Sequence, residues 1–192
     1  IYIPMAPSDA GLALGQALYV ENMSHPVKRE KPLTPFLGPS FKKEEIRSLL
    51  SQFRLNYTEE KDIAKSASQL IADGKTVGWF QGRAEYGPRS LGARSMLADP
   101  RTADSKARVN QLLKKRDWFM PYAPSIQEEY VGEWVKIPHS SPYMQIAFQI
   151  KPEKASLIPA AVHIDGSSRV HVVAKSDNEL YWNLIENFRK QT

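Results

Sequence analysis

Apolar residues recur at helical spacing along several stretches of the chain, and short apolar or alternating runs separate these stretches. A helix that covers a core repeats its apolar side chains every three to four residues, whereas strands appear as shorter runs. The spacing predicts helices over residues 11–20, 41–52, 58–73, 102–116 and 180–188. The runs predict strands over residues 1–5, 53–57, 76–80, 143–151 and 169–174. Helices interleaved with short strands are typical of an α/β (α+β) domain.

Four prolines fall between Ser24 and Ser40, at positions 26, 32, 35 and 39. Proline removes a backbone donor and disfavours helix in the residue before it. The segment is therefore predicted to be a linker or an extended surface strap between two bodies. We place the domain boundary here, with residues 1–23 in one body, 24–40 as the linker and 41–192 in the second domain.

Composition and charge narrow the classes of function. The 192 residues carry a formal net charge of +5 and include no cysteine, which excludes a disulfide scaffold and fits a cytoplasmic protein. The positive charge predicts an anionic partner: nucleic acid, a phosphate metabolite or a membrane surface. No run approaches the roughly 20 apolar residues of a membrane helix, so we expect no membrane span. The start at Ile1 predicts a fragment of a longer protein.

Residues 81–95 form an arginine–glycine loop that is the most informative stretch of the chain. Within it and just beyond it stand four arginines and no lysine: Arg83, Arg89, Arg94 and Arg101. A guanidinium is a planar fork that grips phosphate or carboxylate through two parallel hydrogen bonds. The glycines at 82, 87 and 92 are expected to turn backbone amides toward a ligand. The alternative is a surface loop whose arginines pair with Glu85 and Asp99.

A basic helix is predicted after the loop, and aromatic residues follow it. Its cations are Lys106, Arg108, Lys114, Lys115 and Arg116. Trp118, Phe119 and Tyr122 come next and could stack on bases, so an RNA-binding module is the main alternative function. A solvated helix face would account for the basic run equally well. Arginines gathered in one loop suit a compact anion better than a polymer, so we do not expect a nucleic acid partner.

A long motif within this region resembles a known family. From Gln81 to Arg101 the chain reads QGRAEYGPRSLGARSMLADPR, which resembles the signature of the O-carbamoyltransferases of nodulation-factor and antibiotic synthesis. The resemblance continues through residues 109–110, 114–116, 121–125, 141–144, 158–160 and 163–170. It implies that residues 1–23 are the tail of a Kae1-like domain of the actin/hexokinase type. Residues 41–192 would then be a YrdC-like domain, a twisted sheet with flanking helices, truncated at its C-terminal end.

The resemblance also implies a reaction. The YrdC-like domain is expected to bind carbamoyl phosphate and ATP and to yield carbamoyl-adenylate. The carbamoyl group would then pass to a hydroxyl of a small-molecule or oligosaccharide acceptor, bound mainly by the Kae1-like domain. We expect Arg89, Lys114 and Arg169 to contact the phosphate or carbamoyl groups directly, because preorganised cations stabilise charge on phosphate oxygens. Further binding residues are expected at Arg83, Arg94, Ser95, Arg116, His163 and Asp165.

Other positions carry more specific expectations. By resemblance, Asp9 is one ligand of a divalent metal, Mg or Fe, together with a histidine pair that would lie upstream of Ile1. His163 and Asp165 would form an acid–base pair on one strand face, or else Asp165 belongs to a turn. His171 alternates with two valines and is expected on an edge strand.

Met120 departs from the family pattern, which more often has arginine at this position. Methionine cannot donate to a phosphate. Either a neighbour such as Arg116 substitutes, or the anion site is weaker. A domain that has kept only an interaction role is a further alternative.

Overall fold

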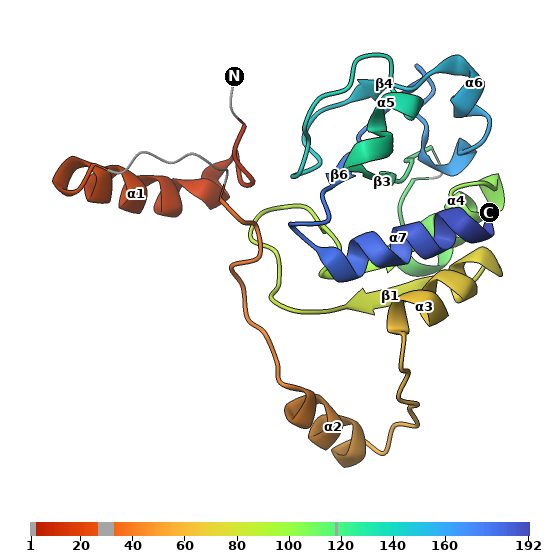
Figure 1. The fold of residues 1–192 in the computed structure, drawn as a ribbon, viewed down its shortest axis with the longest axis horizontal. Coiled ribbons are helices and arrows are strands. Elements are labelled where there is room, and N and C mark those ends of the chain that lie inside the picture. The colour runs from red at the N-terminus through yellow and green to blue at the C-terminus, as the bar shows by residue number, and fades with distance from the viewer. Residues whose placement is uncertain (1–2, 27–32, 118) are drawn as a thin grey trace.

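The computed structural model describes residues 3–26, 33–117 and 119–192, with the side chains of residues 112–114 outside the description. The chain has the predicted α+β organisation (Figure 1). Its helices are η1 (Asp9–Gly11), α1 (Leu12–Ser24), α2 (Lys43–Gln52), α3 (Ile63–Ala72), α4 (Ala103–Arg108), η2 (Val109–Lys114, a π-helix), η3 (Glu128–Tyr130), α5 (Val131–Trp134), α6 (Pro152–Ala155), η4 (Pro159–Ala161) and α7 (Glu179–Gln191). Its strands are β1 (Val77–Phe80), β2 (Arg94–Leu97), β3 (Ser125–Gln127), β4 (Phe148–Gln149), β5 (Ser167–Ser168) and β6 (His171–Val173).

The strands of the described residues pair two by two instead of forming one continuous sheet. β1 and β2 are antiparallel, with Val77 opposite Leu97 and Phe80 opposite Arg94. β3 and β6 run parallel, and β4 pairs antiparallel with β5. None of the helices in the described ranges is long and apolar enough to cross a bilayer.

The first core lies between α3, α7 and β1, which Figure 1 shows side by side. α3 buries one face at positions 64, 67, 68 and 71, the i, i+3, i+4, i+7 spacing of an amphipathic helix. Trp79 of β1 packs on this face together with Leu184 of α7. The indole Nε1 of Trp79 donates to the carbonyl oxygen of Gly92 at 3.0 Å, which joins this core to the arginine–glycine loop.

A second core surrounds the β3–β6 pair, and a third joins the N-terminal segment to the loop. The second consists of Ile126, Val131, Val135, Phe148, Ile150, Val170 and Val172. The third brings together Met5 and Ala6 from the N-terminus, Leu91 from the loop, and Tyr143. Residues before and after the proline-rich segment thus share one apolar cluster.

The proline-rich segment is an extended strap over residues 33–39 that runs along the arginine–glycine loop. The Gly38 amide donates to Ala84 O at 2.9 Å, and the Ala84 amide donates to Pro39 O at 3.0 Å. The Tyr86 amide donates to Pro35 O at 2.7 Å. The strap interpretation therefore describes residues 33–39, while residues 27–32 lie outside the described ranges.

Several predicted elements differ in extent. Residues 53–57 form no strand, because Arg54 has a φ of +52° and turns the chain directly after α2. α3 begins at Ile63 and not at residue 58, because the Asp62 carboxylate caps the helix by accepting from the Lys65 amide at 3.0 Å. The strand expected over 143–151 is confined to β4 and one bridge at Ile150, since Met144 has a φ of +53°. Of the strand predicted over residues 1–5, residues 3–5 pair with no other strand, and residues 1–2 lie outside the description.

His171 lies on an edge strand as expected, because β6 pairs only with β3 among the described residues, but its side chain is buried. Its ring stacks on Tyr181 with centroids 6.0 Å apart. Its Nδ1 lies 3.2 Å from Ser125 Oγ, which also accepts from the Tyr181 hydroxyl at 2.8 Å. Burial lowers the pKa of His171 to about 4 and raises the pKa of Tyr181 to about 12.

This burial predicts a pH dependence of stability. The folded protein holds His171 neutral, whereas the unfolded chain takes up a proton near pH 6.5. The free energy of unfolding should therefore fall by roughly 3 kcal/mol between pH 6.5 and about 4. Urea unfolding of the wild type and His171→Gln over this range measures it: the stability difference between them should shrink as the pH falls. Parallel curves would show that His171 is not held neutral.

Candidate functional site

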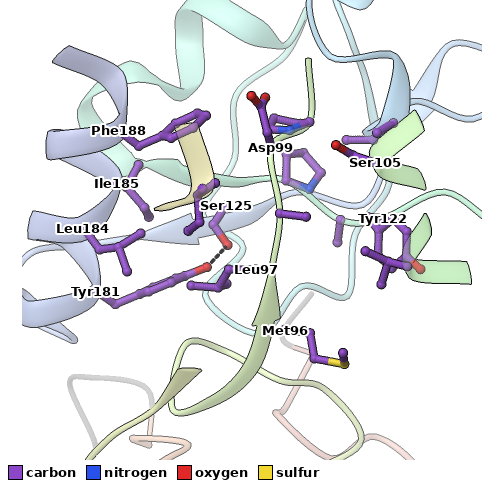
Figure 2. Close-up of a pocket in the computed structure, with 18 residues that line it drawn as sticks. Met96, Leu97, Asp99, Ser105, Tyr122, Ser125, Tyr181, Leu184, Ile185 and Phe188 are labelled. Atoms are coloured by element: carbon purple, nitrogen blue, oxygen red, sulfur yellow. Dashed lines mark hydrogen bonds between the residues drawn. The ribbon is translucent and has the colours of Figure 1, made fainter. Parts of the chain in front are cut away.

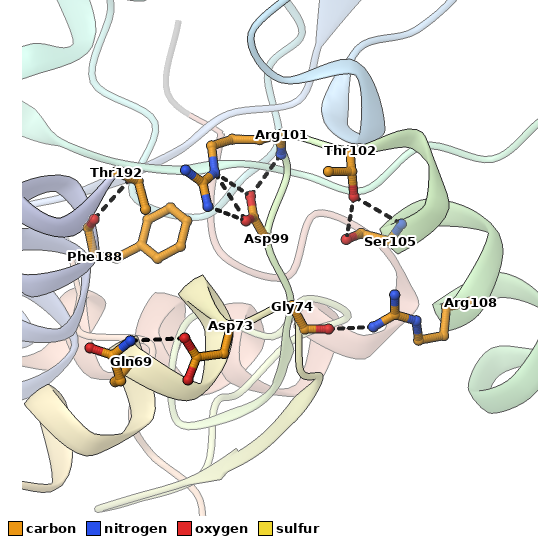
Figure 3. A network of polar contacts seen from close by, with 10 residues as sticks. All are labelled: Gln69, Asp73, Gly74, Asp99, Arg101, Thr102, Ser105, Arg108, Phe188 and Thr192. Carbon is orange, nitrogen blue, oxygen red and sulfur yellow. Dashed lines mark hydrogen bonds and ion pairs between the residues drawn. The ribbon is translucent and has the colours of Figure 1, made fainter.

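Most of the arginines that the structure describes bind other residues of the same chain. Arg47 pairs with Glu59, Arg101 with the buried carboxylate of Asp99, and Arg189 with Glu186. Figure 3 shows the Asp99–Arg101 pair, in which Asp99 also accepts from the Arg101 backbone amide at 2.9 Å. The guanidinium of Arg108 donates to the carbonyl oxygen of Gly74. These side chains stabilise the fold, and the predicted pairing with Asp99 holds for Arg101.

Arg83 and Arg94 hold the strap against the loop. Arg94 donates to Gln81 O at 2.7 Å, to Gly82 O at 3.1 Å and to Pro39 O at 3.3 Å, and its guanidinium lies 3.6 Å from the centroid of Phe80. Arg83 donates through Nε to Gly38 O at 2.9 Å and through Nη2 to Leu37 O. The sequence reasoning missed this role, because a run of arginines does not reveal which of them face carbonyl groups. A direct contact of either side chain with a ligand stays a prediction.

Glu85 organises the loop from within. Its Oε1 accepts three backbone N–H groups, from Leu91 at 2.6 Å, Ala93 at 2.8 Å and Arg94 at 3.2 Å. These amides therefore face a carboxylate of the protein, and the Gly92 amide donates to Ser95 Oγ, so the expectation that the loop amides face a ligand is wrong for residues 91–94. Glu85 makes no ion pair with an arginine within the described residues, so the predicted pairing with it is also wrong.

Two glycines of the loop are required by protein neighbours. Gly87 has a φ of +112°, and a Cβ there would lie 2.5 Å from Met5 O. Gly92 has a φ of +91°, and a Cβ there would lie 2.5 Å from the Tyr181 ring. An L-residue rarely adopts these angles, and it would collide at both positions. The glycines thus admit the N-terminal segment and α7 close to the loop.

Arg89, Arg116 and Arg169 form an arginine cluster that lacks acidic partners within the described ranges. Arg89 and Arg169 are half-buried, and Arg116 is exposed. The Nε of Arg169 is buried without a hydrogen-bond partner. Burial lowers the pKa of Arg169, and repulsion from Arg89 and Arg116 lowers it further. Three guanidiniums from distant parts of the chain therefore converge where a small anion would relieve their repulsion.

Arg116 reaches the cluster because the backbone around it is tied to Asn110. Lys115 has a φ of +47°, and the Arg116 amide donates to Asn110 O at 3.0 Å. The fully buried Asn110 side chain donates to Met120 O at 2.8 Å and accepts from the Tyr122 hydroxyl at 2.6 Å. That Arg116 stands in for an arginine at position 120, or that the anion site is weaker, stays a prediction. Lys114, which is predicted to contact the phosphate or carbamoyl group, ends η2, and its side chain lies outside the described residues.

His163 and Asp165 belong to a tight turn. The Gly166 amide donates to His163 O at 3.0 Å, and the His163 amide donates to Ser167 O at 2.8 Å. Asp165 Oδ1 accepts from the Ser167 hydroxyl at 2.7 Å and from its amide at 2.9 Å, which lowers the pKa of Asp165. The turn alternative is correct, and a shared strand face for the two side chains is wrong.

Ser95 and Asp9 are also predicted site residues. Ser95 Oγ accepts from the Gly92 amide at 3.0 Å and so contributes to the loop. Asp9 is exposed at the start of η1. Within residues 3–26, 33–117 and 119–192, no group of three or more His, Asp or Glu side chains could hold a metal ion. A metal at Asp9 would need ligands from outside these ranges.

An apolar cavity of about 160 Å³ adjoins this region (Figure 2). Leu184, Ile185 and Phe188 of α7 line one side, and the segment from Tyr122 to Ser125 lines another. Tyr122 lines the cavity, and the positive charge of Arg116 partly offsets the rise that burial causes in the pKa of Tyr122. The cavity and the arginine cluster are therefore neighbours. No sequence pattern predicts this cavity, since its lining residues come from six separate stretches.

The fold and the site define the class of protein: an α+β domain with a cluster of arginines suited to a small anion. Residues 68–192 match the family model described as "Carbamoyltransferase C-terminus", and the chain belongs to this family. The family resemblance of the sequence is thereby confirmed.

Three relatives illustrate the similarity. The nodulation protein NolO of Bradyrhizobium diazoefficiens is 38% identical over 199 residues, covering 100% of this chain and 36% of that protein. The nodulation protein NolNO of Sinorhizobium fredii is also 38% identical over 199 residues, covering 100% and 29%. An uncharacterised protein of Synechocystis sp. is 34% identical over 221 residues, covering 100% and 36%. The chain spans about a third of the length of these relatives.

Glu85→Ala should destabilise the protein by roughly 3 kcal/mol, because three backbone N–H groups lose their acceptor. Glu85→Gln keeps an acceptor oxygen without the charge, so it should cost about 1 kcal/mol. Glu44→Ala is the control, since it removes an exposed carboxylate of α2. Urea unfolding measures all three. Equal effects of Glu85→Ala and Glu44→Ala would contradict the role assigned to the Glu85 carboxylate.

Proposed function

We propose that this chain is the part of a carbamoyltransferase that binds carbamoyl phosphate and ATP and yields carbamoyl-adenylate. Hydrolysis of carbamoyl phosphate releases inorganic phosphate, and the resulting carbamate displaces pyrophosphate from ATP. The carbamoyl group then passes to a hydroxyl of a small-molecule or oligosaccharide acceptor, and AMP leaves. The observation that carries the proposal is the arginine cluster of Arg89, Arg116 and Arg169. Membership of the carbamoyltransferase C-terminal family supports the class of reaction.

The charge of the arginine cluster supports a small polyanion as ligand. Three guanidiniums repel one another, and Arg169 carries the additional cost of burial. A phosphate group with a charge of about −2 would offset both costs and supply acceptors for a buried donor such as Arg169 Nε. Because the backbone already holds these side chains near one another, little reorganisation is needed when charge moves among phosphate oxygens.

The apolar cavity supports a nucleotide as the second ligand. Tyr122 lines the cavity and lies within the electrostatic reach of Arg116. A nucleotide could therefore place its base against apolar walls while its phosphates contact the arginine cluster. The ATP would supply the adenylate group, and the residues of this chain would bind and orient it.

Arg89→Ala should weaken the binding of carbamoyl phosphate tenfold or more, about the contribution of one charge-assisted contact. Calorimetric titration of the chain measures this affinity. Arg54→Ala is the matched control, because it removes the same charge from an exposed residue outside the arginine cluster. Equal weakening by both variants would show that only total charge matters. No heat with the folded wild type, in buffers of different ionisation enthalpy, would contradict the proposal for this chain.

The same titration separates a small anion from the RNA-binding alternative. A compact phosphate releases few counterions, so its affinity should fall only slightly as the salt concentration rises. A single-stranded RNA bound along a basic surface would show a steep fall. Tight RNA binding with a steep slope, together with no carbamoyl phosphate binding, would favour the alternative.

A further inference from the structure

Unpaired buried polar atoms are concentrated in one short segment. Among the described residues, three buried side-chain atoms lack a hydrogen-bond partner: Ser141 Oγ, Gln145 Oε1 and Arg169 Nε. Buried polar atoms in folded proteins nearly always have partners, because an unpaired one destabilises the fold. Arg169 belongs to the arginine cluster, and the other two lie within residues 141–145. We call these five residues the 141–145 segment.

The side-chain amide of Gln145 has a defined orientation. Its Nε2 donates to the carbonyl oxygen of Pro4 at 2.6 Å, which only the nitrogen end of the amide can do. Oε1 is therefore the buried end without a partner. A carbonyl oxygen accepts and cannot donate, so the missing partner must carry an N–H or O–H group.

Ser141 is held beside β6, and the backbone close to it is strained. Its carbonyl oxygen accepts from the Val172 amide at 3.1 Å, while the residue is only 3% exposed. Met144 has a φ of +53°, which non-glycine residues rarely adopt. Strained backbone and unpaired polar atoms tend to persist where function requires them.

The 141–145 segment lies next to the parts of the chain that carry the arginine cluster. Tyr143 packs against Leu91, which is two residues from Arg89. Val172, which bonds to Ser141, is three residues from Arg169, roughly 10 Å along a strand. Leu91 also lines a cavity of about 430 Å³ together with Pro142 and Tyr143 of the segment. The segment and the loop that carries Arg89 therefore border the same cavity.

Recognition of a carbamoyl group requires an acceptor that arginines cannot supply. A guanidinium only donates hydrogen bonds, so an arginine cluster binds any small phosphate and does not distinguish an amide from a methyl group. A carbamoyl group presents two N–H donors and one carbonyl acceptor. Gln145 Oε1 and Ser141 Oγ offer the complementary acceptor and donor.

We propose that the 141–145 segment recognises the amide end of carbamoyl phosphate, with Gln145 Oε1 accepting its N–H and Ser141 Oγ donating to its carbonyl oxygen. This inference rests on the proposed function, in which the arginine cluster holds the phosphate end. A ligand without the N–H groups leaves Gln145 Oε1 unpaired, and a ligand that also lacks the carbonyl oxygen leaves Ser141 Oγ unpaired as well, so the site rejects both. The 141–145 segment therefore determines specificity, and the arginine cluster supplies general affinity.

The test compares carbamoyl phosphate, acetyl phosphate and inorganic phosphate in calorimetric titrations of the chain. Acetyl phosphate replaces the amino group by a methyl group, so the wild type should bind carbamoyl phosphate about tenfold or more tightly. Gln145→Met should reduce this ratio about fivefold. Ser141→Ala removes the donor to the carbonyl oxygen, which both acyl phosphates carry, so it should weaken the binding of both about fivefold and leave their ratio unchanged. Neither variant should change the affinity for inorganic phosphate. Ser156→Ala, at an exposed serine after α6, is the control and should change none of these affinities.

Thermal unfolding of Ser141→Ala adds a readout that separates recognition from structure. The variant removes a buried hydroxyl that has no partner, so it should unfold at the same temperature as the wild type or higher. A destabilised Ser141→Ala, an unchanged ratio in Gln145→Met, or an unchanged affinity of Ser141→Ala for both acyl phosphates would overturn the inference, while phosphate binding would still support the proposed function. If inorganic phosphate does not bind, or binds equally to Arg89→Ala, the proposed function fails and the inference fails with it.

Discussion

The arginine–glycine loop depends on one carboxylate. Glu85 accepts three backbone N–H groups that no neighbouring strand or helix serves, and this fixes the chain from Leu91 to Arg94. Once it is fixed, Leu91 enters the third core, and the carbonyl of Gly92 accepts from Trp79 and from the side chain of Gln81. The Glu85 carboxylate supplies the negative charge on which these amides converge, so the protein's own side chain holds the loop in this conformation.

Most of the arginines that the structure describes are bound by other groups of the protein, whereas the arginine cluster has no acidic partner within the described ranges. Arg101 has its carboxylate, and Arg94 has the carbonyl groups of the strap and the loop. Placing Arg89, Arg116 and Arg169 together brings no such compensation, and the pKa of Arg169 falls as a result of burial and repulsion. The repulsion among these guanidiniums and the burial of Arg169 are unfavourable in the protein alone. An anionic ligand would offset both effects, and this contributes to its binding free energy.

The apolar pattern of the sequence predicted those helices and strands that bury one face or one run against a core. The apolar spacing of α3 and α7 and the apolar run of β1 identify these elements because each buries one face or one run against a core. The pattern at residues 53–57 misled, since alternation shows that a strand is possible but not that a partner strand is present. The convergence of Arg89, Arg116 and Arg169 could not be derived, because it joins residues 80 positions apart through three separate loops. Nor does sequence distinguish Glu85 as a partner of amides from Glu85 as a partner of arginines.

The proline-rich strap separates two regions along the chain, but in space it joins them. The family match begins at residue 68, yet Met5 and Ala6 pack on Leu91, and Pro4 accepts from Gln145. The strap itself receives hydrogen bonds from Arg83 and Arg94 at one end and from Tyr143 through Leu33 O at the other. Both the loop that carries Arg89 and the 141–145 segment are thus supported by residues that precede the matched domain. A displacement of the N-terminal segment would therefore act on both ends of the proposed ligand at once, since a packed cluster transmits strain instead of absorbing it.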